Sequence, residues 1–206
     1  MARPQSADYE ERKKKILSTA SNLFAKNGYH KAAISQVAIS CNMSKSLIYH
    51  YYDSKQEVLY HAMLEHVQEL EKLANDIMQE NLEPEITLRK IIRQYLYIYE
   101  GSVAQHHLLI NELESLTATQ KSKIIRIQNN VVKAFADIAE TLAPASLSKH
   151  NARTAISMLL LGMLNWTYIW FKPEGQIKTD QLSEIIACMF ISGLTGLHDD
   201  VFTKTS

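Results

Sequence analysis

The stretch AISQVAISCNMSKSLIYHYY, residues 33–52, contains the pattern that decides the fold. Asn42 divides it, and Asn is the non-glycine residue that best tolerates the left-handed conformation found just past a helix end. Apolar residues before Asn42 recur at intervals of three and four, the spacing of a buried stripe on one helix face: Ile34, Val37, Ala38 and Cys41. The first half therefore predicts a short helix that ends at a sharp corner.

The second half predicts another short helix, over residues 45–52. Ser44 precedes it and can cap it through its side-chain oxygen, while Ile48 and Tyr52 are spaced to face inward. The outward face then carries groups suited to phosphates and base edges: Lys45, Ser46, Tyr49 and His50. Two short helices that meet at a corner in this way form a helix-turn-helix.

Together with Gly28-Tyr29 before it and Ser54-Lys55 after it, this stretch resembles the N-terminal domain of TetR-family transcriptional regulators. The similarity runs without a gap from about Glu11 to about Leu64. It implies an all-α, TetR-like fold of nine helices, with a three-helix DNA-binding head over residues 1–54 and a six-helix ligand-binding and dimerisation body over residues 55–206. It also implies a homodimer that binds a double-stranded DNA operator and releases it when a small-molecule inducer binds.

The chain departs from the family pattern where the first helix of the motif begins. Ala32 and Ala33 replace a common Thr pair, so the usual side-chain cap and phosphate contact are absent, at a cost of about 1 kcal/mol for the cap. We expect the Ser35 hydroxyl to make the phosphate contact in place of the missing Thr pair.

We assign roles within the motif by chemistry. Lys55 and Tyr49 are expected to contact phosphates, whereas Ser46 and Leu47 are expected to contact base edges, with Ser44, Lys45 and His50 beside them. For Leu47 two interpretations stay open: apolar contact with a thymine methyl group, or packing in the core beside Ile48.

The formal net charge of zero conceals an asymmetry along the chain. Residues 1–55 carry nine Lys and Arg against four Asp and Glu, and the remainder carries thirteen against eighteen. A basic head on an acidic body suits attraction to DNA with a defined orientation. Apolar runs are shorter than the ~20 residues that span a bilayer, so we expect no membrane partner. Only two cysteines occur, far apart in the sequence, and they suggest no disulfide, so we expect a reducing, cytoplasmic location.

The body is predicted to consist of helices over residues 55–79, 86–99, 103–116, 119–142, 149–171 and 179–197. The last two carry small and apolar residues on one side, which permits close helix packing: Ala155, Met158, Leu159, Gly162 and Met163, then Ile185, Met189, Ser192, Gly193 and Gly196. These surfaces form either the dimer interface that the resemblance implies or part of the body's own core.

Residues 165–171, NWTYIWF, resemble a segment of TetR members that respond to acyl-coenzyme A thioesters. An acyl-CoA is therefore one candidate inducer. Polar or aromatic groups among aliphatic neighbours are candidates to contact it: Tyr95, Tyr99, His107, Asn111, Asn129, Phe135, Asn165, Trp166 and Trp170. Each of these residues also suits an ordinary core.

Catalytic patterns are absent from the sequence, which has no Gly-rich phosphate loop, nucleophile elbow or H-E-x-x-H motif. We therefore expect no enzyme and no cofactor. Neither Cys41 and Cys188 nor the His106-His107 pair with Glu112 has the spacing of a metal site. The alternative to an inducer-controlled repressor is an adaptor of the same fold, which binds DNA and acts through a protein partner.

Overall fold

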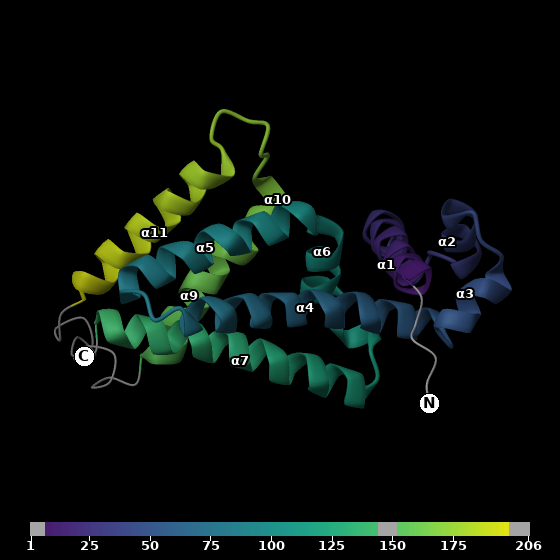
Figure 1. Ribbon diagram of the computed structural model, residues 1–206, viewed down its shortest axis with the longest axis horizontal. Helices are drawn as coiled ribbons and strands as arrows, with labels where there is room; N and C mark the ends of the chain where they lie inside the picture. Colours follow the sequence, from purple (N-terminus) through teal and green to yellow (C-terminus); the bar gives the residue numbers. More distant parts are fainter. Residues whose placement is uncertain (1–6, 144–151, 198–206) are drawn as a thin grey trace, which may run out of the picture. The chain divides into compact units, whose positions relative to one another are not determined.

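The computed structural model describes residues 7–143 and 152–197, and over these ranges the chain forms helices joined by turns, without strands (Figure 1). The all-α fold class predicted from the sequence is confirmed. The helices, in chain order, are α1 Ala7–Asn27, α2 Ile34–Cys41, α3 Lys45–Tyr51, α4 Lys55–Gln79, α5 Pro84–Gly101, α6 Val103–Asn111, the 3-10 turn η1 Leu113–Ser115, α7 Ala118–Leu142, α9 Arg153–Asn165, α10 Thr167–Trp170 and α11 Thr179–Thr195.

The contacts group the chain into two compact units. The first contains the chain up to Gln68 together with Ser102–Ile125, and the second contains Glu69–Gly101 together with the chain from Arg126 onward. Helices α4 and α7 therefore contribute their first parts to the first unit and the rest to the second. The domain boundary between residues 54 and 55 stays a prediction, because a grouping by contacts does not show which part folds alone.

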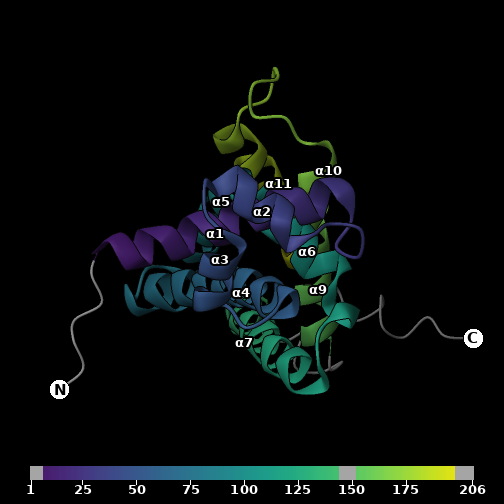
Figure 2. The ribbon, with the colours of Figure 1, turned by 90° about the vertical axis from the view of Figure 1, so that its right-hand side faces the viewer.

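The first unit is built around α1, which buries Ile16, Ala20 and Phe24 and packs against α2 and α6. Helices α1, α2 and α3 lie together in both Figure 1 and Figure 2. After α1, Gly28 has a φ of 80°, which glycine adopts without side-chain strain. This left-handed residue ends α1 and begins the turn into α2.

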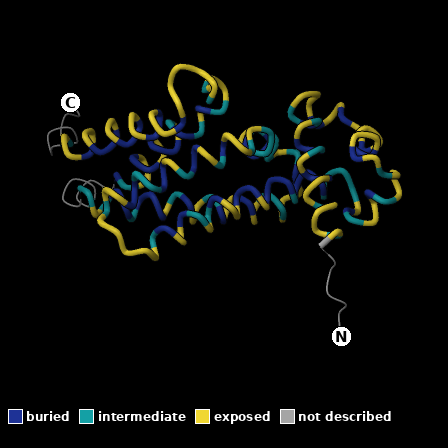
Figure 3. Tube along the Cα trace, turned by 45° about the horizontal axis from the view of Figure 1, so that its top comes forward, coloured by how far each residue is buried: buried dark blue, intermediate teal, exposed yellow. Residues whose placement is uncertain are grey.

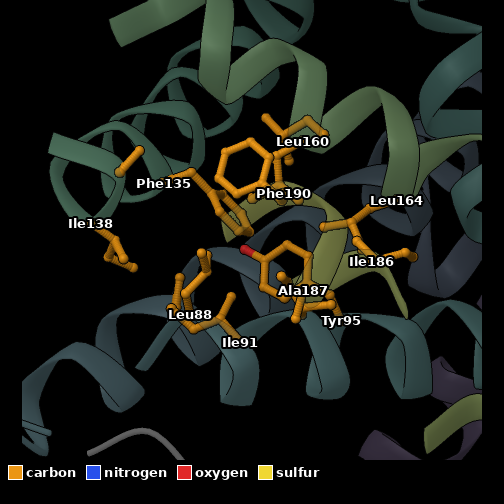
Figure 4. Packing of buried hydrophobic residues seen from close by; sticks show 14 of the residues in the cluster. Leu88, Ile91, Tyr95, Phe135, Ile138, Leu160, Leu164, Ile186, Ala187 and Phe190 are labelled. Atoms are coloured by element: carbon orange, nitrogen blue, oxygen red, sulfur yellow. The ribbon is translucent and has the colours of Figure 1, made fainter. Parts of the chain in front are cut away.

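The second unit has an apolar core to which α5, α7, α9 and α11 all contribute (Figure 4). Tyr95 of α5 is fully buried, and its ring centroid lies 5.3 Å from that of Phe135 of α7 in an edge-to-face arrangement. Leu160 of α9 and Phe190 of α11 close the cluster. Along α11, buried and exposed positions alternate with the helical repeat, so one face of that helix is left uncovered within the unit (Figure 3).

Charged side chains join α5 to α11 at the surface of this unit. Arg93 Nε and the Tyr97 hydroxyl both donate to Asp180 Oδ1 at 2.7 Å. Arg89 Nη1 donates to Glu184 Oε2 at 2.5 Å and also lies 3.6 Å from Cys188 Sγ. Exposed ion pairs of this kind contribute little each, but together they favour one register of α11 on α5.

Two predicted helices are interrupted. The helix predicted over residues 103–116 ends at Asn111 and continues as the turn η1. The helix predicted over residues 149–171 is divided into α9 and α10 at Trp166, and its first residues lie outside the described ranges. The Thr167 hydroxyl donates to the Leu164 carbonyl at 2.7 Å. A side chain therefore bonds to a backbone carbonyl at the break between the two helices.

Candidate nucleic-acid interface and ligand-binding core

The corner between α2 and α3 has the predicted geometry. Asn42 adopts φ 56° and ψ 44°, the left-handed conformation, and its N–H donates to the Ile39 carbonyl at 3.0 Å. The N–H of Met43 donates to the Ala38 carbonyl at 2.9 Å. These bonds satisfy carbonyls at the end of α2 and turn the chain directly into α3.

Ser44 caps α3, as predicted. Its Oγ accepts the N–H of Leu47 at 3.1 Å and lies 2.9 Å from the hydroxyl of Ser46. Ile48 and Tyr52 are buried beneath this short helix. The cap and the buried pair together fix which face of α3 points outward.

The outward face of α3 presents the predicted DNA-binding groups to solvent. Lys45, Ser46, Tyr49 and His50 are all exposed, and Lys45 Nζ lies 5.7 Å from the centroid of the Tyr49 ring. Ser35 is exposed on α2. A cation, hydroxyl groups and an imidazole on one helix face match what phosphates and base edges bind. Their contacts with DNA stay a prediction.

Leu47 lies between the two environments proposed for it. It is half-buried, and it lines a groove of about 400 Å³ together with residues of α1 and of the α2–α3 turn, among them Arg12, Lys15 and Met43. Since Leu47 is neither in the core nor fully exposed, its placement leaves both interpretations open.

Two further contacts support the motif, and neither was predicted from the sequence. Gln36 Oε1 accepts the N–H of Ala33 at 2.9 Å, which serves the start of α2 although Ala33 itself has no side-chain cap. A Gln three residues into a helix is the available signal for this contact. At the other end of the motif, the Tyr51 ring lies 4.8 Å from that of Tyr9 on α1, a contact without a local sequence signal.

The structure gives Lys55 a set of contacts that the sequence did not predict. Its ammonium group donates to the carbonyls of Tyr29, His30 and Ala32, in the turn between α1 and α2. The predicted phosphate contact of Lys55 is not tested by this geometry, but it would require at least one of these bonds to break.

Four of the nine candidate ligand residues meet in the second unit. Tyr95 donates to the Leu70 carbonyl at 2.8 Å, and Tyr99 donates to Asn165 Oδ1 at 2.8 Å. The ring of Tyr95 contacts those of both Tyr99 and Phe135. Burial is the main reason that the pKa of each of these tyrosines is raised, so both stay neutral donors.

The other five candidates do not join that cluster. Trp166 and Trp170 are 62% and 52% exposed. Asn129 is exposed on α7 and lines a groove of about 460 Å³ with Lys133 and Arg153. His107 and Asn111 belong to α6 and thus to the first unit. Whether any of the nine residues contacts a ligand stays a prediction.

A buried histidine pair in the first unit has no counterpart among the predicted residues. His66 Nε2 of α4 lies 3.1 Å from His106 Nδ1 of α6. Burial lowers the pKa of His66 to about 4, because the charged imidazolium is poorly solvated there. At neutral pH His66 is therefore uncharged.

Among the described residues, His, Cys, Asp and Glu side chains do not gather in a group that could hold a metal ion. Cys41 is buried and Cys188 is exposed, and both are free thiols. In the same described part of the chain, none of the helices is long and apolar enough to cross a membrane.

Two family models match the chain: the one for bacterial regulatory proteins of the tetR family over residues 16–62, and the one for the tetracyclin repressor-like C-terminal domain over residues 81–194. The fold, the helix-turn-helix and these matches define a DNA-binding transcriptional regulator and not an enzyme. The chain belongs to the TetR family.

Known relatives extend over almost the whole chain. A TetR-family regulator from Bordetella parapertussis is 30% identical, with a TM-score of 0.85 over 93% of this chain and 100% of that chain. The HTH-type transcriptional repressor KstR2 from Rhodococcus jostii is 19% identical over 91% of this chain and 93% of the repressor. AibR, solved in complex with isovaleryl coenzyme A and operator DNA, shares the fold at 24% identity and a TM-score of 0.75, covering 86% of this chain and 97% of AibR.

Proposed function

We propose that the protein binds a palindromic operator as a homodimer and represses transcription from the cytoplasm until a small-molecule inducer releases it. The observation that carries this proposal is the exposed face of α3, where Lys45, Ser46, Tyr49 and His50 stand on a helix fixed by its cap and its buried side. Two such helices related by a two-fold axis can enter successive major grooves, roughly 34 to 36 Å apart.

Exposed surfaces on α9 and α11 support the homodimer. On α9, Met158 and Leu159 are 53% and 68% exposed, and on α11 Met189 is 64% exposed. The neighbouring small residues Gly162 and Gly193 are exposed as well. Apolar groups left uncovered beside glycines favour an interface with a second copy over the alternative that these faces complete the body's own core.

The inducer is the finer part of the proposal, and we favour an acyl-CoA thioester. The resemblance of residues 165–171 to acyl-CoA-responsive members motivates this choice, and so does AibR, a protein of the same fold in complex with isovaleryl coenzyme A. In the proposed mechanism the inducer prefers a conformation in which α4 moves and the two heads lose register with the operator. Such a shift requires different affinities for the two conformations.

A binding assay against fragments of the surrounding genome tests the DNA-binding part. We expect a preferred palindromic fragment at physiological salt and affinity that falls steeply as salt rises. Equal affinity for all fragments would contradict the proposal.

A thermal-shift and DNA-release screen of acyl-CoA thioesters, free acids and cationic drugs tests the inducer. Release by a thioester but not by its free acid supports the acyl-CoA, and release by cationic drugs alone contradicts it. If nothing releases the DNA while a protein partner co-purifies, the protein is the adaptor considered above.

A further inference from the structure

The ammonium group of Lys55, the first residue of α4, is surrounded by backbone carbonyls. Its Nζ lies 2.6 Å from the carbonyl oxygen of Tyr29, 2.9 Å from that of Ala32 and 3.3 Å from that of His30. A lysine ammonium has three N–H donors, so the three carbonyls can use all of them. The ring of Tyr29 adds a cation–π contact, with its centroid 4.3 Å from Nζ.

These carbonyls belong to the turn that leads from α1 into the helix-turn-helix. Gly28 starts the turn with its left-handed φ, and the N–H of Ala32 donates to the Gly28 carbonyl at 3.1 Å. Ala33, one residue further on, starts α2 without a side-chain cap. The turn thus sets the position of α2, and a cation is what makes three converging carbonyl dipoles favourable.

The first turn of α4 is also held by contacts of the two residues that follow Lys55, so the backbone from which its side chain extends has a defined position. Gln56 Nε2 donates to the Ser115 carbonyl at 2.7 Å, and Gln120 Nε2 donates to Glu57 Oε1 at 2.8 Å. The pKa of Lys55 is lowered by burial, against an opposing effect of Glu112. Lys55 is half-buried, whereas Lys31 and Lys45 are exposed.

We propose that Lys55 is a positioning residue for the helix-turn-helix: its ammonium holds the turn of residues 28–33, and through that turn α2 and α3, instead of contacting a DNA phosphate. The inference rests on the proposed operator binding. A phosphate contact contributes equally to every DNA sequence, whereas a positioning residue contributes where α3 must meet particular base edges. The two roles therefore differ in what they do to specificity and to salt dependence.

The first experiment compares Lys55→Met with Lys31→Met at several salt concentrations. Lys31 is an exposed lysine of the same turn, so its replacement removes the same charge without touching the three carbonyls. We expect Lys55→Met to lower the ratio of operator to non-specific affinity by about tenfold or more while the salt slope stays unchanged, and Lys31→Met to keep the ratio. If Lys55→Met weakens both affinities by the same factor and reduces the slope by about 0.9, Lys55 is a phosphate contact and the proposal is wrong.

A second experiment needs no substitution, so it decides the question even if Lys55→Met does not fold. Lysine acylation is followed by mass spectrometry in the wild-type protein, free and bound to operator. The lowered pKa of Lys55 leaves more of the reactive neutral amine, but its nitrogen is held against three carbonyls and the Tyr29 ring, so we expect Lys55 to react slowly in both states. We expect Lys31 to react fast when free and Lys45 to become protected on binding. Fast acylation of Lys55 in the free protein, with protection only on DNA, would overturn the proposal. If Lys45 gains no protection either, the proposed operator contact of α3 fails separately from the role of Lys55.

Discussion

The outward face of α3 and the tyrosine cluster of the second unit both place hydroxyl groups on helices, with opposite outcomes. On α3, Ser46 and Tyr49 are exposed. In the second unit, the hydroxyls of Tyr95 and Tyr99 are buried and each donates a hydrogen bond. An exposed hydroxyl is available to a partner, whereas a buried and bonded one stabilises the fold. The same residue type thus indicates binding in one region and stability in the other.

The largest effect should come from emptying the tyrosine cluster. We expect Tyr95→Ala to lower the free energy of unfolding by about 3 to 5 kcal/mol, because it removes a buried ring and the hydrogen bond from its hydroxyl to the Leu70 carbonyl. Tyr97→Ala, on the same helix at a site that is 41% exposed, should cost less than about 1 kcal/mol. Urea unfolding measures both, and equal losses would show that burial does not separate these two tyrosines.

The buried histidine pair should make stability depend on pH in the acidic range, whereas the buried tyrosines stay neutral there. Since the pKa of His66 is lowered to about 4 in the folded state, the unfolded chain binds more protons between about pH 6.5 and pH 4. Stability should therefore fall as pH drops through this window, by about 3 kcal/mol at pH 4 for this one group. His66→Gln keeps a polar partner for His106 and does not titrate, so it should flatten this part of the curve. An unchanged curve would mean that His66 is not the group responsible.

On the outward face of α3, replacing a residue that contacts a base edge should alter which DNA sequence the protein prefers. We expect Ser46→Ala or Leu47→Ala to change discrimination at one or two base pairs by about 1 to 3 kcal/mol, with little change at the others. Competition assays with single-base operator variants measure this effect. If Leu47→Ala lowers thermal stability and leaves sequence preference intact, Leu47 belongs to the core.

The smallest effect concerns a hydroxyl that is exposed and nevertheless hydrogen-bonded within the fold. Ser44 is exposed, yet its oxygen is used by the Leu47 N–H. Ser44→Ala should cost about 1 kcal/mol of stability. Ser40, an exposed serine within α2, is the matched control, and Ser40→Ala should be neutral or slightly stabilising. A loss at Ser40 as large as that at Ser44 would argue against the cap.

Local signals explain why the helix-turn-helix was predictable. The stripe on α2, the left-handed Asn42 and the Ser44 cap each depend on residues within a few positions of one another. The ends of α4 and of α7 were likewise close to the predicted ones, because the sequence there has a cap or a proline beside a long apolar stripe.

Contacts between distant residues explain what was not predictable. The carbonyls bound by Lys55 lie 23 to 26 positions earlier in the chain, and carbonyl groups leave no trace in a sequence. His66 and His106 meet across 40 positions. In the second unit, Tyr95 and Trp166 show the same sequence pattern, an aromatic ring among aliphatic neighbours. Tyr95 is nevertheless fully buried, whereas Trp166 is 62% exposed.

The two thiols of the chain also differ in exposure, so a thiol reagent can reach only one of them in the folded protein. Cys41 is buried in the first unit, while Cys188 is exposed on α11, next to Met189 of the face proposed for the homodimer. A thiol-specific spin label should therefore attach at one position of the wild-type chain. In a homodimer the two labels would sit on equivalent α11 helices. Their separation would report directly on how those helices meet, with and without an inducer.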